Sequence, residues 1–330
     1  MLKYIVKRLL LSILILFGVS LIIYFLVRMM PMSYLDTKFS AQIQAGTIKQ
    51  EQVDAFKEIY GLADNSFLGI LKGYFVWVGN MLKLDLGVSF VHSEPVGKVI
   101  AEHMWVSFFI AFVATVLQFL IAIPLGITSA THQYSVRDYS VTVLTMVGIS
   151  LPSFFFAALL IRVFASGLGW FPVQGLVSGG ASYSGIAYYL DMLWHLVLPM
   201  IVLVVLSIGG LMRYTRTNML EVLNSDYIRT ARAKGLSEKK TIYVHAFRNT
   251  MIPLATLLAG ILPSLFGGAM ITEEVFAIKG IGQLAYASLK QADIPFIMGY
   301  NMFLAVLTVI GTLLSDIMYA IVDPRVKLGK

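Results

Sequence analysis

The stretch that decides the fold reads Ser225-Asp226-Tyr227-Ile228-Arg229-Thr230-Ala231-Arg232-Ala233-Lys234-Gly235, a short basic island between two long apolar segments. Ser225 or Asp226 can begin a helix, because either side chain can accept a hydrogen bond from the free N–H groups of a first turn. Gly235 can end that helix, because glycine adopts the left-handed conformation beyond a last turn without penalty. The stretch therefore predicts a helix of roughly two turns, which is too short to be stable alone in water and needs a surface to rest on.

The faces of this short helix are expected to differ. Tyr227, Ile228 and Ala231 are predicted to share one face at i, i+1 and i+4 spacing, while the basic side chains mostly point elsewhere. On charge alone, the alternative is a solvated loop of the kind that carries positive charge on the cytoplasmic side of a membrane.

A second helix is expected directly after the first. Ser237 followed by Glu238 is typical of a helix N-terminus. We expect this helix to run toward Arg248 and to stop before Pro253, because proline lacks the N–H that a helix interior needs.

The composition indicates a membrane protein. Hydrophobic residues make up 58% of the chain and charged residues only 13%, about half the charged fraction of a soluble domain. The net charge of +7 comes from residues beside apolar runs, which favours the positive-inside pattern over a nucleic-acid-binding face. The chain has no cysteine, which excludes disulfides and thiolate metal sites.

Six apolar segments are predicted to cross the membrane. The first begins like a signal peptide, but its apolar run is longer and leads into Arg28-Met29-Met30-Pro31 instead of a small-residue cleavage site. The third is interrupted by Pro152. The predicted spans are residues 9–27, 105–127, 140–164, 193–212, 252–271 and 296–322.

Basic residues predict the orientation of these spans. Lys3, Lys7 and Arg8 precede the first span, which places the N-terminus in the cytoplasm. Six crossings then return the C-terminus to the cytoplasm, and the same topology places the basic loop there. The expected organisation is a transmembrane helix in 1–30, an extracytoplasmic region in 31–98, a core of five spans in 99–322 with the basic loop 213–250, and a cytoplasmic tail in 323–330.

Common enzyme motifs are absent from the sequence. There is no G-x-x-x-x-G-K-[ST] phosphate loop, no H-E-x-x-H pair and no G-x-S-x-G nucleophile elbow. The histidines are too dispersed to suggest a zinc site. We therefore predict no catalytic residue and no metal ligand in this chain.

Polar residues inside spans are candidates for function, since a charge at bilayer depth costs about 2.5–3.5 kcal/mol on insertion scales. Gln118 lies in the second span, where it either bonds a neighbouring helix or faces a pathway. Asn301 and Asp316 lie in the last span, and Asp316 is expected to pair with a basic residue. The spans carry no series of acidic residues, which counts against ion-coupled transport.

Residues 227–236 resemble the cytoplasmic coupling ("EAA") loop of ABC importer permeases, in the form typical of the oligopeptide and dipeptide branch. Arg229, Thr230 and Ala231 occupy the positions of the Glu-Ala-Ala triplet. Further landmarks follow in the order typical of that family: Leu84-Asp85-Leu86-Gly87, Leu168-Gly169-Trp170-Phe171-Pro172, Glu273-Glu274-Val275-Phe276, Gly280-Ile281-Gly282, Asp293-Ile294-Pro295 and Asp323-Pro324-Arg325.

This resemblance implies an all-α integral membrane protein with six transmembrane helices, the type I ABC importer permease fold and an extracytoplasmic insertion after the first helix. It also implies that the short helix docks into a groove on an ATP-hydrolysing subunit. The residues implied in this coupling are Asp226, Tyr227, Ile228, Arg229, Thr230, Ala231, Ala233, Lys234 and Gly235.

The implied partners are a second homologous permease, two ATP-binding subunits, an extracytoplasmic substrate-binding protein, a peptide substrate and the lipid of a bacterial cell membrane. ATP and Mg would be bound by the partner subunits, and this chain would hold no cofactor. Nickel and glutathione systems share the same branch and stay open as substrates. The competing classes are an ion-coupled secondary transporter, which would need an internal repeat and ion ligands, and a structural membrane anchor.

Overall fold

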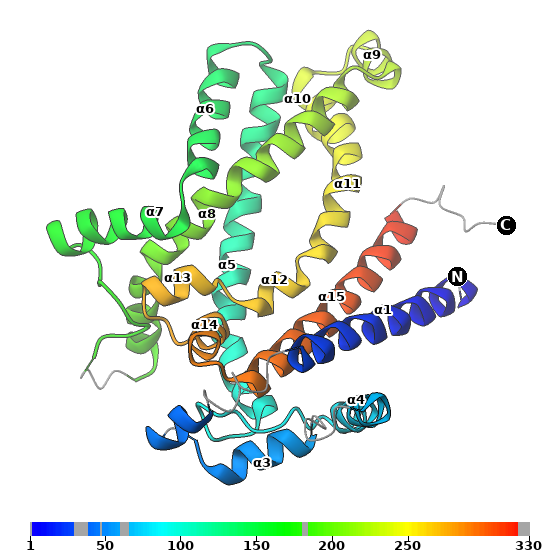
Figure 1. Ribbon diagram of the computed structural model, residues 1–330. Coiled ribbons are helices and arrows are strands. Elements are labelled where there is room, and N and C mark those ends of the chain that lie inside the picture. Colours follow the sequence, from blue (N-terminus) through cyan, green and yellow to red (C-terminus); the bar gives the residue numbers. More distant parts are fainter. Residues whose placement is uncertain (1, 30–38, 47, 60–65, 180–183, 323–330) are drawn as a thin grey trace.

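The computed structural model describes residues 2–29, 39–46, 48–59, 66–179 and 184–322, and helices dominate this part of the chain (Figure 1). Its extended pairing is limited to one isolated bridge between Val88 and Pro95. The tail predicted for 323–330 and parts of the predicted region 31–98 lie outside the described residues. The elements are α1 (Leu2–Arg28), α3 (Gln50–Ile59), α4 (Phe67–Leu82), α5 (Val96–Thr131), α6 (Val136–Ser150), α7 (Ser153–Leu160), the π-helix η1 (Ile161–Gly167), α8 (Ile186–Leu223), α9 (Asp226–Ala233), α10 (Glu238–Lys240), the π-helix η2 (Thr241–Ala246), α11 (Phe247–Gly260), α12 (Leu262–Gly267), α13 (Met270–Val275), α14 (Ile281–Gln291) and α15 (Ile294–Val322).

Four helices of the described chain, α1, α5, α8 and α15, are long and apolar enough to cross a membrane. They contain the first, second, fourth and sixth predicted spans. α5 has 36 residues and α8 has 38, which corresponds to about 54 and 57 Å. Both helices therefore extend beyond a hydrocarbon layer of about 30 Å.

The third predicted span is bent. α6 and the helix formed by α7 and η1 together meet the criteria for a span, but they are bent by 100° at the break between them. Pro152 occupies the N-cap of α7 with extended backbone, and proline has no N–H to continue the hydrogen-bond ladder of α6. The predicted interruption at Pro152 is confirmed.

The fifth predicted span, 252–271, is not one continuous helix. It is divided among α11, α12 and the start of α13, so the described chain has at most five candidate spans.

The helix expected directly after the basic island was predicted to stop before Pro253, and this is wrong: α11 continues through Pro253 to Gly260. α11 ends there, and a further break follows α12 at Gly268. Gly268 has a φ of +74°, and an added Cβ would lie 2.5 Å from Gly282 N, so the position excludes a side chain.

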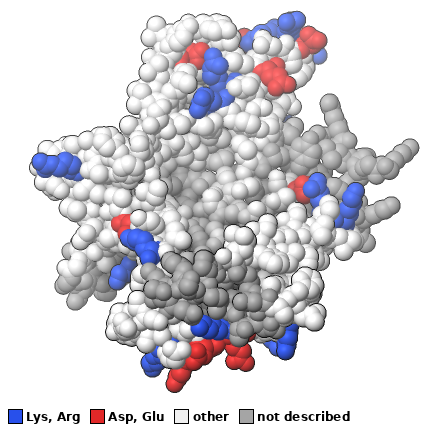
Figure 2. Space-filling model, viewed as in Figure 1, with Lys and Arg blue, Asp and Glu red and all other residues white. Residues whose placement is uncertain are grey.

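The two ends of the bundle are formed by different elements. α9 lies at one end, and α3, α4, α13 and α14 lie toward the other (Figure 1). α5 packs along α8, and α1 packs along α15. Tyr24 of α1 joins Tyr74 and Trp77 of α4 in one buried cluster. Charged side chains form groups at the top and bottom of the visible face, and further groups lie on its left and right sides between them (Figure 2).

Candidate functional site

α9 forms where the basic island predicts it. It covers Asp226–Ala233, with Ser225 at the N-cap in extended conformation. The Ser225 hydroxyl donates to Val222 O at 2.6 Å and makes no capping bond to the helix. Gly235 has a φ of +76°, the left-handed conformation that glycine adopts without penalty just beyond the end of a helix.

α9 buries two of its side chains against the bundle. Ile228 is 0% exposed and Ala231 is 7% exposed. Ile228 belongs to a cluster that contains Met219 of α8 and Ala246 of η2. Tyr227 was predicted on this face, and that is wrong, because it is 47% exposed. The buried stripe is centred toward Ile228, and Tyr227 lies about 100° from Ile228 around the helix, so Tyr227 falls at the edge of the buried face.

The remaining face of α9 is open. Its ion pairs are weak surface contacts: Arg229 Nη1 lies 3.6 Å from Asp226 Oδ1, and the Asp226 side chain is 97% exposed. A two-turn helix that buries only two side chains has most of its surface free for another molecule. The predicted residues on the exposed surface are Asp226, Tyr227, Arg229, Thr230, Ala233, Lys234 and Gly235.

A buried ion pair supports the bundle at the α9 end. Asp138 at the start of α6 is 3% exposed and accepts two hydrogen bonds from Arg216 of α8, at 2.9 and 2.8 Å. It also accepts hydrogen bonds from Ser129 of α5 and from the backbone N–H of Tyr134 at 3.0 Å. Sequence reasoning missed this network, because its partners are separated by up to 78 residues.

The three polar residues predicted within spans lie in different surroundings. Gln118 Nε2 donates to Ser207 O at 3.0 Å, which joins α5 to α8. Asn301 is exposed and donates to Ile297 O of its own helix at 2.8 Å. Asp316 Oδ2 lies 3.0 Å from Arg8 Nη1, which joins α15 to α1. The structure does not bring the three together.

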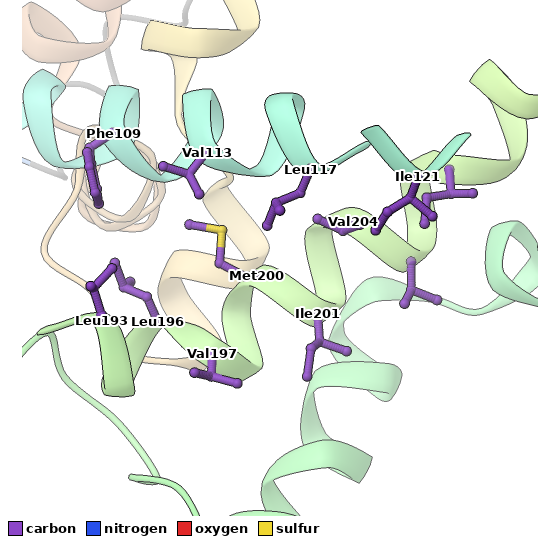
Figure 3. A pocket seen from close by; sticks show the side chains of 12 residues that line it. Phe109, Val113, Leu117, Ile121, Leu193, Leu196, Val197, Met200, Ile201 and Val204 are labelled. Carbon is purple, nitrogen blue, oxygen red and sulfur yellow. The ribbon is translucent and has the colours of Figure 1, made fainter. Parts of the chain in front are cut away.

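An apolar groove runs between α5 and α8 (Figure 3). Phe109, Val113, Leu117 and Ile121 line it from α5 at four-residue spacing, and Met200 is among the side chains that line it from α8. The groove encloses a cavity of about 540 Å³ and its lining has no titratable side chain. Among the described residues, no group of three His, Asp or Glu side chains is placed to hold a metal ion.

Glu273 organises the end of the bundle opposite α9. This carboxylate is 1% exposed and accepts hydrogen bonds from Ser107 Oγ at 2.7 Å, Ala269 N at 2.9 Å and Gln283 N at 3.0 Å. A Cβ at Gly280 would lie 2.4 Å from Glu273 Oε2, so the close packing around the carboxylate requires glycine there.

Asp293 fixes a second segment at this end. Its buried carboxylate accepts hydrogen bonds from Ser89 Oγ at 2.5 Å, Phe90 N at 3.0 Å and Val91 N at 3.1 Å. These bonds join the segment before α5 to the start of α15. On the surface nearby, the Glu274 carboxylate accepts a hydrogen bond from Lys290 Nζ at 3.0 Å and raises the pKa of that ammonium.

The described chain is thus an apolar helical bundle with an open basic helix at one end. Residues 122–328 match the family model described as "Binding-protein-dependent transport system inner membrane component". The chain belongs to this family. It is a non-catalytic membrane component of an ABC transport system.

Relatives match the chain over nearly its whole length. It is 38% identical to the oligopeptide transport system permease protein AppB of Bacillus subtilis, over 99% of this chain and 100% of the relative. It is 34% identical to the dipeptide transport system permease protein DppB of Lactococcus lactis, with the same coverage. A chain of the MetNI methionine ABC transporter in an inward-facing crystal form has a similar fold, with a TM-score of 0.52 at 16% identity over 70% of this chain and 99% of that one.

Proposed function

We propose that this chain forms, together with a second homologous permease, the membrane pathway of an importer for oligopeptides or dipeptides. The relatives that match it over full length are named as oligopeptide and dipeptide permeases, which supports a peptide substrate. Two ATP-binding subunits supply the energy and bind ATP and Mg. An extracytoplasmic binding protein delivers the peptide.

The coupling element is α9, and its mode of attachment is the observation that carries this proposal. Ile228 and Ala231 fix it to the bundle, while the remaining predicted coupling residues stay open to a partner. α9 contacts η2, which leads directly into α11. When the ATP-binding subunits close, they move α9 and with it the ends of α8 and α11.

The same proposal fixes the orientation in the membrane. The loop that carries α9 faces the cytoplasm, because ATP is hydrolysed there and because basic loops remain on that side. The N- and C-termini are cytoplasmic, and the region 31–98 is extracytoplasmic. The cell is bacterial and the membrane is its plasma membrane.

The test is purification of the tagged chain from its native membrane, with Gly235→Pro compared against Gly169→Pro. Both glycines are exposed and have positive φ, with nothing within 4 Å of an added Cβ. Each also donates one backbone hydrogen bond, Gly235 to Arg232 O and Gly169 to Ala165 O. Proline therefore causes the same kind of damage at both sites.

We expect the unmodified chain and Gly169→Pro to retain a second permease and both ATP-binding subunits. Gly235→Pro should retain the second permease and lose the ATP-binding subunits. A chain that purifies alone and still transports would instead support the ion-coupled secondary transporter. Uptake of labelled di- and oligopeptides, measured beside nickel and glutathione, tests the substrate.

A further inference from the structure

The turn between α5 and α6 presents an aromatic side chain in a strained conformation. Tyr134 has a φ of +63°, which costs a residue other than glycine about 1 kcal/mol. Its side chain is 73% exposed, so no burial within this chain offsets that cost. The turn lies at the same end of the bundle as α9 (Figure 1).

The buried ion pair holds this turn in shape. The backbone N–H of Tyr134 donates to Asp138 Oδ2, and Arg216 binds the same carboxylate through two hydrogen bonds. Ser135 Oγ caps the following helix by accepting from Asp138 N. Strained residues that persist under such support are typical of contact and binding sites.

The turn and the segment that follows α9 line one hollow. It encloses about 400 Å³. His132 and Gln133 line it from the turn, Arg232 lines it from α9 itself, and Glu238 and Ile242 line it from the segment after α9. Arg232 Nε donates to Glu238 Oε1 at 2.8 Å, so these two charges of the lining are paired with each other. The rest of the polar lining, which includes His132 and Gln133, consists of side chains that can donate hydrogen bonds.

We propose that this turn is a second docking contact for the ATP-binding subunit, which packs on Tyr134 and inserts an acidic side chain into the hollow. The inference rests on the proposed docking of α9. The two contacts are continuous across the hollow, so one partner surface reaches both. Arg137 Nη1 lies 3.1 Å from His132 Nε2 beside the hollow and supplies the positive charge that an acidic partner would meet.

A second contact would connect the partner to helices that α9 does not reach. α9 follows α8 and leads through η2 to α11, whereas the turn joins α5 to α6. A partner held at both places contacts both helix pairs. The Asp138–Arg216 ion pair links α6 to α8, so force applied at either contact is transmitted to the other pair.

Site-directed photocrosslinking tests the contact, and the chain has no cysteine to remove. Tyr134→Cys, Thr230→Cys and Leu84→Cys each receive a benzophenone maleimide within the assembled transporter. Thr230 lies on the exposed face of α9, and Leu84 is 86% exposed in the segment before α5. Adducts are identified by gel shift and mass spectrometry.

We expect positions 134 and 230 to crosslink to the same ATP-binding subunit and position 84 not to do so. If position 230 crosslinks to the ATP-binding subunit while position 134 crosslinks only to lipid or to nothing, this inference is overturned and the docking of α9 stands. That outcome would assign Tyr134 to the headgroup layer, where tyrosine is common. No adduct at either 134 or 230 overturns both.

The acidic character of the partner is tested with opposite charges at one position. Gln133→Glu should weaken retention of the ATP-binding subunits about threefold at low salt, the effect of one exposed charge pair, and Gln133→Lys should not weaken it. The difference should shrink at high salt as the charges are screened. Equal effects of the two variants would contradict an acidic contact.

Discussion

α9 and the opposite end of the bundle are stabilised in different ways. At the α9 end, an eight-residue helix is attached through Ile228 and Ala231 and leaves most of its surface open. At the opposite end, Glu273 and Asp293 are buried carboxylates that each accept at least three hydrogen bonds. α9 is held by a small apolar contact. The opposite end is held by buried polar groups, which cannot bond to water and depend on one another as hydrogen-bond partners.

This difference suits two tasks. Segments with few buried contacts open at low free-energy cost and are the ones that move. Buried polar networks are expensive to break, because each lost partner leaves a donor or acceptor without water. α9 is suited to being displaced by a partner. The Asp138 network beside it and the two carboxylates at the opposite end are suited to holding the longer helices in place while that happens.

The largest expected effect is at Glu273. Glu273→Ala leaves the Ser107 hydroxyl and two backbone N–H groups without an acceptor, and we expect it to lower the free energy of unfolding by about 3 kcal/mol. Glu274→Ala is the matched control. It removes only an exposed ion pair with Lys290 and should cost less than about 1 kcal/mol. Thermal unfolding in detergent measures both. Equal losses would mean that the carboxylate network is not what stabilises this end.

The next effect is at Ile228. Ile228→Ala removes a fully buried side chain from the contact of α9 and should cost about 2–3 kcal/mol. We expect the loss to be local, with faster hydrogen exchange in α9 and little change in global unfolding. Tyr227→Ala, on the exposed side, should leave exchange in α9 nearly unchanged. A global loss of stability in Ile228→Ala would contradict the independence of the two ends.

A smaller effect is expected at Gly235. Gly235→Ala forces a side chain into the left-handed conformation and should cost about 1 kcal/mol. Gly235→Asn should cost less, because asparagine tolerates that conformation. Since an added Cβ at Gly235 meets nothing within 4 Å, the two variants separate backbone strain from crowding. Hydrogen exchange of residues 226–236 measures the difference, and a larger cost for asparagine would contradict it.

The smallest effect is expected at Arg232. Its ion pair with Glu238 is exposed, with side chains 43% and 63% accessible, and Arg232→Ala should change stability by less than about 0.5 kcal/mol. The amount of ATP-binding subunit that co-purifies should fall by more than a stability loss of this size would cause. Urea unfolding of the isolated chain, run beside co-purification, separates the two readouts. Proportional losses would assign Arg232 a purely structural role.

Local signals predicted much of the fold. α9 begins after Ser225 and ends before Gly235 as predicted, although the predicted Ser225 side-chain cap is not formed. The break in the third span follows from Pro152, because a proline acts on its own neighbourhood. The extent of the bend could not be predicted, since it depends on what α7 packs against. Pro253 misled for the same reason: neighbouring helices allow α11 to continue through a residue that would end a helix in water.

The site was predictable only in part. Basic, small and glycine residues in one stretch indicated α9, but the face that it buries depends on Met219 and Ala246, which lie on other elements. Glu273 and Asp138 gave no signal of their own, because their main partners lie 166 and 78 residues away in sequence. The motif of Glu273 with Gly280 and Gly282 marked the region without indicating that a carboxylate organises it.

The bend between α6 and α7 has a consequence for the membrane. α6 has 15 residues, or about 22 Å, and α7 turns away from its axis with Phe154 and Phe155 exposed. On this flank the protein offers a hydrophobic height several ångströms less than the thickness of a typical bilayer. Either the lipid thins here to match it, or a neighbouring subunit covers the flank. In both cases the surroundings of α6 differ from those of α1, whose full length can meet an unperturbed bilayer.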